Sequence, residues 1–160
     1  MYFISSNKEL PLYTYEHPRP SVTVDVAIIR PNGKEYQILL IQRGQAPYKG
    51  KYALPGGFIN MDESLEGAAQ RELFEETGVE NLGLTQIQTF SDPGRDPRGR
   101  VISTCFGCVL DIGDKIQIMP GDDAADAEWF ELNDLPLLAF DHFTLVQAAI
   151  VKLLPSVSNS

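Results

Sequence analysis

The sequence predicts an α/β fold in which a mixed β-sheet is covered by helices on its faces. The chain has 160 residues, of which 43% are hydrophobic, a length and composition suited to one domain with a real core. Most segments alternate apolar and polar residues with the period of a strand. Only two segments have helical spacing, and many strands with two helices indicate a sheet packed against helices.

No internal repeat or change of composition divides the chain. Residues 1–20 are polar, contain Pro11, Pro18 and Pro20, and are expected to form an irregular N-terminal arm. We expect a single domain over residues 21–155 and a short tail over residues 156–160.

The strands begin with a predicted hairpin. The segment "SVTVDVAIIR" (21–30) alternates at period two, "PNGK" (31–34) has the composition of a turn, and "EYQILLIQR" (35–43) alternates again. A loop (44–52) and a short strand (53–59) interrupted by Gly56-Gly57 follow. Further strands are expected near residues 82–90, 100–111, 115–119 and 127–132.

Two helices complete the prediction. The first runs from about Glu63 to Thr77, with Asp62 as N-cap and Gly78 as the C-terminal stop. The second covers residues 141–154 with Asp141 as N-cap. Its apolar face is expected to consist of Phe143, Val146, Ala149, Ile150 and Leu153.

Composition excludes several classes of function. A net charge of −9 disfavours binding of nucleic acid through its phosphates, which needs a basic face. No apolar run approaches the roughly 20 residues that span a bilayer, and the N-terminus lacks a signal-peptide pattern, so we expect a cytoplasmic protein without membrane partners. Cys105 and Cys108 lie three apart in a strand pattern and should point to opposite faces as free thiols, rather than share zinc or form a redox pair.

Glutamates interrupt the apolar side of the first helix. That side consists of Leu65, Ala68, Ala69 and Leu73. At about 100° per residue, Glu72 and Glu76 project into the same sector, and Glu75 lies at its border. Burying like charges is costly unless a cation compensates them. A solvated acidic face is the competing interpretation, but it would lie opposite the alanines and leucines.

A divalent metal would supply that cation. Carboxylate oxygens suit Mg²⁺ or Mn²⁺ rather than zinc, and Arg71, one turn before Glu75, can orient the glutamates. Gly56-Gly57 allows the backbone to approach a ligand, so a carbonyl from this turn could join the metal shell. For Gly-Gly alone, a plain tight turn explains the residues better.

The same residues resemble a known pattern. Gly57, Glu63 and "RELFEETGV" (71–79) match the Nudix box, G-x5-E-x7-R-E-U-x-E-E-x-G-U, at all nine constrained positions. The chain resembles a Nudix hydrolase over roughly residues 20–155. This resemblance implies an α/β/α sandwich and metal-dependent hydrolysis of a nucleoside diphosphate linked to another moiety. It also implies that Glu72, Glu75, Glu76 and the Gly57 carbonyl hold the metal, with Glu63 and Arg71 as a supporting pair.

Two regions of the sequence could supply the general base. Some members of the family use a glutamate of the box, and others use an acid on a distant loop. In this sequence the loop candidates are Asp122, Asp123 and Asp126, all of which could instead be turn residues or surface charges. We rank Glu76 or Glu72 above them.

A second segment bears on the substrate. "SDPGRDPRGRVIS" (91–103) holds three arginines in six residues and is either a polar loop or an anion clamp. With "HPRPSVTVDVAI" (17–28) and Pro93, it resembles the ADP-ribose pyrophosphatase branch of the superfamily. That branch implies cleavage of ADP-ribose to AMP and ribose 5-phosphate. The implied contact residues are Arg43, Arg95, Arg98 and Arg100, with Tyr48, Phe90 or Phe140 stacking on adenine, although such aromatics are more often core residues than stacking ones.

Two alternatives are kept. The box is equally compatible with a nucleotide sugar, a dinucleotide or an oxidised nucleoside triphosphate as substrate. A non-catalytic ADP-ribose sensor is disfavoured because all the glutamates of the box are present and the chain is acidic. A small-molecule nucleotide is the expected partner, and the arm with an outward Phe74 leaves a homodimer open.

Overall fold

The computed structural model describes residues 12–119, 121 and 124–154, without the side chains of residues 124 and 125. The order of elements is β1 (Ser21–Asn32), β2 (Glu35–Arg43), β3 (Tyr52–Ala53), β4 (Gly56–Phe58), α1 (Leu65–Thr77), β5 (Thr85–Phe90), β6 (Val101–Val109), β7 (Ala124–Glu131) and α2 (His142–Leu153). This arrangement confirms the predicted mixed sheet with two helices.

The sheet is organised around β1. Its end pairs antiparallel with β2 to form the predicted hairpin, closed by Gly33 at a φ of 63°. Its beginning pairs antiparallel with β4, and its residues 21–29 pair parallel with β6. β5 lies beside β6, and β2 also pairs with β3 and β7. The long central strand therefore joins the two glycines of β4 to the rest of the sheet.

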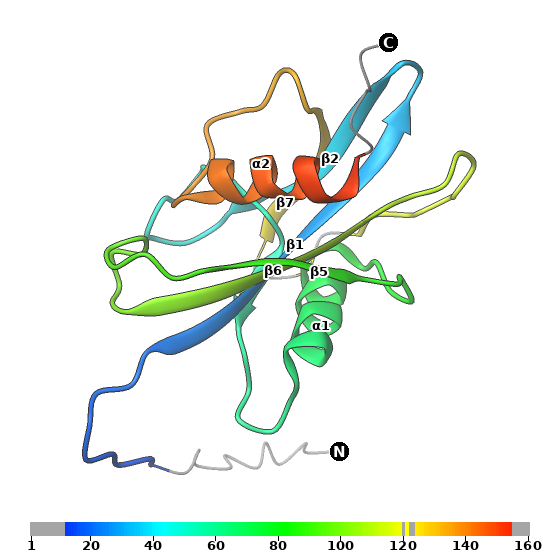
Figure 1. Ribbon diagram of the computed structural model, residues 1–160. Coiled ribbons are helices and arrows are strands. Elements are labelled where there is room, and N and C mark those ends of the chain that lie inside the picture. The colour runs from blue at the N-terminus through cyan, green and yellow to red at the C-terminus, as the bar shows by residue number, and fades with distance from the viewer. Residues whose placement is uncertain (1–11, 120, 122–123, 155–160) are drawn as a thin grey trace, which may run out of the picture.

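The helices cover opposite faces of the sheet (Figure 1). Val24, Val26 and Ile28 of β1 pack toward α1, whereas Ala27 and Ile29 pack toward α2. A strand buried on both faces reads as a continuous apolar run, as in parallel sheets. The structure is thus a three-layer sandwich with a hydrophobic cluster on each side of the sheet. The α1-side cluster contains Val24, Val26 and Ile28, and the α2-side cluster contains Ala27 and Ile29.

Helix α1 begins later than expected. The prediction of Asp62 as N-cap is wrong, because Ser64 caps the helix and its hydroxyl accepts from the Gly67 N–H at 3.0 Å. Glu63 stays outside the helix, where its carboxylate accepts from the Asn60 N–H and from Arg71. The stop at Gly78 is confirmed, with a left-handed φ of 73°.

Helix α2 starts at His142 with Asp141 at its N-cap, but the Asp141 side chain makes no capping hydrogen bond. Its carboxylate accepts instead from Arg95, which satisfies it outside the helix. The predicted apolar face is wrong at Phe143, which is 59% exposed. The buried face is formed by His142, Leu145, Val146 and Ala149.

The prediction of a strand over residues 115–119 is wrong, whereas the prediction for the two cysteines is confirmed. Residues 115–119 form no strand. Ile116 and Ile118 instead pack on the α1-side cluster, and the Met119 N–H donates to the Thr77 carbonyl. The thiols behave as expected, since Cys105 lies in the α2-side cluster and Cys108 packs against the α1-side cluster. Within the described ranges, no helix is both long and apolar enough to cross a bilayer.

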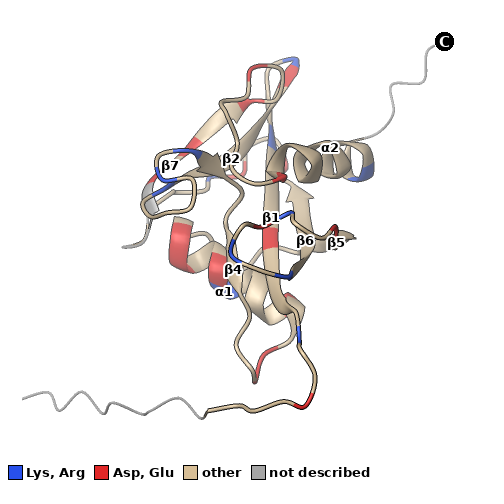
Figure 2. Cartoon of the chain, turned by 90° about the vertical axis from the view of Figure 1, so that its left-hand side faces the viewer, with Lys and Arg blue, Asp and Glu red and all other residues tan. Residues whose placement is uncertain are grey.

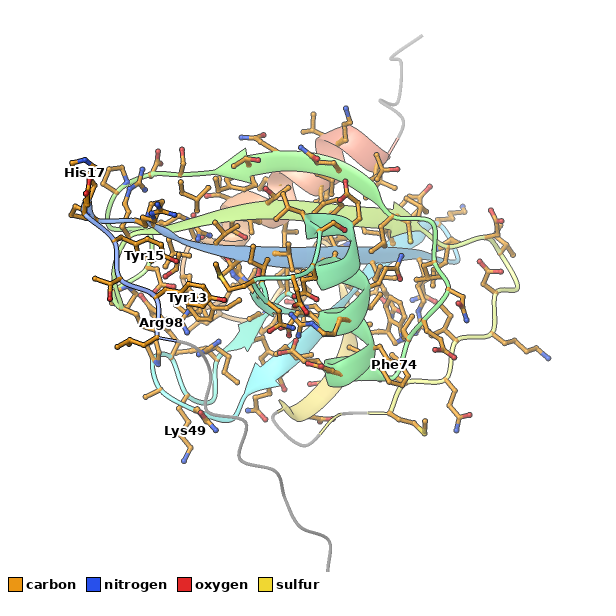
Figure 3. All side chains as sticks on the ribbon, turned by 90° about the horizontal axis from the view of Figure 1, so that it is seen from below. Tyr13, Tyr15, His17, Lys49, Phe74 and Arg98 are labelled. Carbon is orange, nitrogen blue, oxygen red and sulfur yellow. The ribbon has the colours of Figure 1, made fainter. Side chains whose placement is uncertain are left out.

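The packing of α1 can be tested at two adjacent residues. Leu73 is completely buried against the sheet, whereas Phe74, labelled in Figure 3, is 51% exposed. We expect Leu73→Ala to lower the free energy of unfolding by about 2–5 kcal/mol, because it leaves a cavity beneath the helix. Phe74→Ala is the matched control and should change it little. Urea denaturation measures both, and equal losses would contradict this packing.

Candidate functional site

Helix α1 turns its carboxylates toward β4. Glu72 is buried, Glu76 is half-buried and Glu75 is exposed. The Gly56 N–H donates to Glu76 Oε2 at 3.0 Å. A Cβ added at Gly57 would lie 2.5 Å from Glu72 Oε1. Gly57 is therefore needed for the close approach of the β4 backbone to the acidic helix, whereas Gly56 allows close packing on β1, where an added Cβ would meet the Val24 carbonyl (Figure 2).

Arg71 joins this helix to the loop before it. Its Nη2 donates to Glu63 Oε1 at 2.6 Å and to the Phe58 carbonyl at 3.1 Å. Its Nη1 donates to Glu72 Oε1 at 2.8 Å and to Glu75 Oε2 at 3.2 Å. One guanidinium thus contacts three of the predicted site glutamates and the end of β4, and the supporting role of Arg71 in catalysis stays a prediction.

Burial and hydrogen bonding shift these carboxyl groups in opposite directions. The hydrogen bonds from Arg71 lower the pKa of Glu63 to about 2. Burial raises the pKa of Glu72, although Arg71 opposes this shift. Burial, reinforced by the charges of Glu72 and Asp25, raises the pKa of Glu76 to about 8 despite the Gly56 N–H. Charging the inner carboxyls therefore costs free energy, which a nearby cation would offset.

The donors fit a hard divalent cation in their chemistry, since they are carboxylate and carbonyl oxygens. Over the described ranges, no three carboxylate, imidazole or thiol groups already form a compact metal cluster. Arg71 and the Gly56 N–H engage these oxygens in this arrangement. Assignment of Gly57, Glu72, Glu75 and Glu76 as metal ligands stays a prediction.

A cavity of about 100 Å³ opens beside the glycine pair. Asp25 of β1, Arg43 of β2, Arg98 and His142 contribute to its walls, together with Gly56 and Gly57. No carboxylate of α1 lines this cavity, but Glu76 and Arg43 line a second pocket together, and Figure 2 shows the acidic residues of α1 close to β4. Such a pairing suits a ligand that is anionic and also requires a cation.

The predicted arginines separate into three groups. Arg43 and Arg98 line the cavity with their guanidinium carbons 4.8 and 5.2 Å from the centroid of the Phe140 ring. Arg95 also lines it, but its side chain is 5% exposed and both its Nε and Nη2 donate to Asp141. Arg100 is not among the lining residues, and its Nη1 donates to the Ser91 carbonyl. Figure 3 shows Arg98 on the same side of the molecule as Lys49.

The aromatic candidates also differ. Phe90 is buried in the α2-side cluster, so its predicted stacking on adenine is wrong. Phe140 has a left-handed φ of 51°, an uncommon conformation for a bulky residue, and lines the cavity. Tyr48 packs edge-on against it with ring centroids 4.8 Å apart. Phe58, which was not predicted, lies beneath Arg98 at 4.9 Å.

Three aspartates downstream of α1 were the alternative candidates for the general base. Asp122 and Asp123 lie outside the described residues. Asp126 is exposed on β7, is paired in register with Gln42, and accepts from the Ala127 N–H. It does not line the cavity beside the glycine pair.

Sequence reasoning missed three buried polar residues beside the cavity. Asp25 accepts from Ser103 Oγ at 2.5 Å, and His142 Nε2 lies 3.4 Å from Asp25 Oδ1. The Leu54 N–H donates to His142 Nδ1 at 3.0 Å. A charged residue inside the apolar run "SVTVDVAIIR" was the available signal for Asp25, because carboxylates are rarely buried without partners.

Known proteins are similar to this chain in sequence and in fold. Residues 19–149 match the family model of the NUDIX domain. An ADP-ribose pyrophosphatase from Methanocaldococcus jannaschii is 46% identical over 129 residues, which are 80% of this chain and 72% of that protein.

Solved structures agree with this relationship. The NUDIX domain of Shewanella oneidensis NrtR complexed with ADP ribose aligns with a TM-score of 0.73 and 33% identity, over 83% of this chain and 88% of that chain. A bifunctional NMN adenylyltransferase/ADP ribose pyrophosphatase from Francisella tularensis, complexed with AMP and a Mn ion, aligns with a TM-score of 0.74 and 33% identity. That alignment covers 86% of this chain but 43% of the bifunctional protein. Shewanella NrtR has also been solved with a 27mer DNA, and this chain spans 59% of that longer chain.

The raised pKa of Glu76 predicts how stability depends on pH without metal. The folded protein holds this proton up to about pH 8, whereas an ordinary glutamate releases it near 4.5. The resulting stabilisation is complete below the lower value and is lost as the pH rises through the higher one. In EDTA, we expect the free energy of unfolding to fall less across this window in Glu76→Gln than in wild type. Urea denaturation at several pH values measures it, with exposed Glu66→Gln as control. Parallel wild-type and Glu76→Gln curves would refute the assignment.

Proposed function

The chain belongs to the NUDIX domain family, and we propose that it hydrolyses the pyrophosphate bond of ADP-ribose, with Mg²⁺ as cofactor, to AMP and ribose 5-phosphate. The observation that carries this proposal is the position of the glycine pair of β4, because Gly56 donates to Glu76 of α1 and both glycines line a cavity together with Arg43 and Arg98. The 46% sequence identity between this chain and the M. jannaschii ADP-ribose pyrophosphatase supports the choice of substrate.

The acidic side of the site would hold the metal. We assign Glu72, Glu75, Glu76 and the Gly57 carbonyl as its ligands, because oxygen donors on one helix and the adjoining strand suit Mg²⁺ or Mn²⁺. When bound, the ion neutralises diphosphate charge and makes water more acidic. Arg71 contacts Glu63, Glu72 and Glu75 and so restrains these side chains before metal and substrate bind.

The arginine side would hold the diphosphate. Among the described residues, no carboxylate forms an ion pair with Arg43, whose Nε donates to the Pro47 carbonyl. Its remaining N–H groups can donate to phosphate oxygens. Arg98 is held by Asp96, with Nη2 donating at 2.7 Å, so its guanidinium is already oriented. Phe140 and Phe58 offer apolar faces next to these cations for the nucleotide base.

Proton transfer is assigned to the box glutamates. Glu76 or Glu72 would accept the proton of the attacking water, because both lie at the inner end of the site and bear raised pKa values. A carboxylate that costs free energy to keep charged is a better base than an ordinary surface acid. Asp126 is exposed on β7 and ranks below them.

An ADP-ribose sensor is the second candidate. Shewanella NrtR, solved with ADP ribose and with DNA, shares the domain and gives this alternative a specific basis. Against it, this chain has all three glutamates assigned to the metal, and its net charge of −9 is unsuited to DNA. We therefore propose a small-molecule nucleotide as the partner of this chain. Other nucleoside diphosphate derivatives remain as alternative substrates for the same site.

A substrate screen tests the proposed reaction. We expect purified protein with Mg²⁺ to release AMP and ribose 5-phosphate from ADP-ribose faster than it cleaves nucleotide sugars, dinucleotides or oxidised nucleoside triphosphates. EDTA should abolish turnover and Mn²⁺ should restore it, because the inner carboxylates cannot replace the cation. Liquid chromatography of the products measures this. Preference for another compound would overturn the substrate, and binding without cleavage would favour the sensor.

The arginines can be separated by substitution. We expect Arg98→Ala to lower kcat/KM for ADP-ribose roughly 10- to 100-fold, since it removes a charged donor to the diphosphate. Arg100→Ala is the matched control from the same loop and should leave it nearly unchanged, because that guanidinium points to the Ser91 carbonyl. Steady-state kinetics with both variants checks this. Equal losses would show that the loop, and not Arg98 itself, contacts the substrate.

A further inference from the structure

His142 lies where both sides of the site join the second helix. It is the first residue of α2, is 5% exposed, and lines the same cavity as Arg43 and Arg98. Its Nδ1 accepts from the Leu54 N–H at 3.0 Å. Its Nε2 lies 3.4 Å from Asp25 Oδ1. The imidazole therefore contacts the segment before β4 on one side and the central strand on the other.

These contacts fix the proton of the imidazole. Because Nδ1 accepts a backbone hydrogen bond, it carries no proton, and the single proton of a neutral ring must be on Nε2, facing Asp25. Burial lowers the pKa of His142, although the charges of Asp25 and Asp141 oppose the shift. Ser103 holds the other oxygen of Asp25 at 2.5 Å. The ring is thus a neutral tautomer oriented from both ends.

This arrangement leaves neither nitrogen available for chemistry. Nδ1 is occupied by the Leu54 N–H, and Nε2 already bears a proton directed at a carboxylate. A general base needs a free lone pair within reach of the proton it removes. His142 therefore does not fit the role of a base, despite lining the cavity.

The segment that His142 holds also contacts helix α1. The Leu54 N–H bonds to His142, the Pro55 carbonyl accepts from the Val26 N–H at 2.8 Å, and the Gly56 N–H donates to Glu76 at 3.0 Å. Three consecutive residues are thus tied in turn to α2, β1 and α1. A Cβ at Gly56 would lie 2.2 Å from the Val24 carbonyl, so this backbone has no room to shift toward β1.

We propose that His142 is a positioning residue for hydrolysis: by accepting the Leu54 N–H, it holds residues 54–57 so that the Gly56 N–H meets Glu76. The proposal rests on the proposed function in that Glu76 serves the reaction. Loss of the acceptor leaves a buried N–H without a partner, which the backbone can satisfy only by moving. That movement would carry Gly56 and Gly57 with it.

Two substitutions separate the two nitrogens of the ring. In His142→Asn the amide oxygen can take the place of Nδ1 and accept from Leu54, whereas in His142→Gln the amide nitrogen can take the place of Nε2 and donate to Asp25. We expect His142→Gln to lower kcat for ADP-ribose roughly 10- to 100-fold with a smaller change in KM, and His142→Asn to retain most of kcat. His17→Asn and His17→Gln, at an exposed histidine, are the matched controls.

A second measurement does not depend on turnover. Long-range ¹H–¹⁵N spectra of the wild-type protein at neutral pH should show His142 with a proton on Nε2 and none on Nδ1. The Leu54 amide should exchange slowly with solvent in wild type and in His142→Asn, and faster in His142→Gln. Both readouts are available without metal or substrate.

The outcomes are distinct. Full kcat in His142→Gln would overturn the proposal. Equal losses in both variants would also overturn it, because they would show that any change of this buried side chain matters, and not the loss of the Nδ1 acceptor in particular. A proton on Nδ1 would overturn it as well. If His142→Gln does not fold, low kcat in folded His142→Asn still refutes it. If wild-type protein does not cleave ADP-ribose, the proposed function fails, while the spectra and the Leu54 amide still judge the role of His142.

Discussion

Desolvation of acidic side chains on α1 is the constraint on which the rest of the site depends. Glu72 is buried and Glu76 half-buried, so each needs donors that compensate for lost water. Arg71 supplies a donor to Glu72, and the Gly56 N–H supplies one to Glu76. The β4 backbone can lie this close to Glu72 because residue 57 is a glycine, and Gly56 allows the same strand to pack closely on β1. The spacing of glycine, arginine and glutamate in the sequence thus answers one electrostatic requirement.

Positive charge is scarce in a chain of net charge −9, and the structure concentrates it near the cavity. Arg95 and Arg98 each pair with an aspartate, which fixes the direction of the guanidinium and reduces the entropy lost on binding an anion. Arg43 lies between them and the carboxylates, and burial together with Arg98 lowers its pKa. The anion site is therefore built from oriented cations rather than from an excess of charge.

Local spacing was sufficient to predict the β1–β2 hairpin, the stop of α1 at Gly78 and the opposite orientation of the two thiols, because each depends on one element or one turn. The family was predicted for the same reason, since its motif lies within 23 consecutive residues. Contacts between distant elements were not predictable. Asp25 and His142 are 117 positions apart and meet only through packing of α2 on the sheet. The alternation of residues 115–119 suggested a strand, but packing of Ile116 and Ile118 on the core explains it without one. Metal ligands and the general base remain predictions.

Three consecutive residues at the start of α2 each secure a different wall of the cavity. Phe140 lies under Arg43 and Arg98, Asp141 holds Arg95, and His142 holds Leu54. Regions linked in this way tend to open and close as one cooperative unit. Fraying of a single helical turn would therefore release the nucleotide pocket and the β4 backbone together, and the walls could not loosen one at a time.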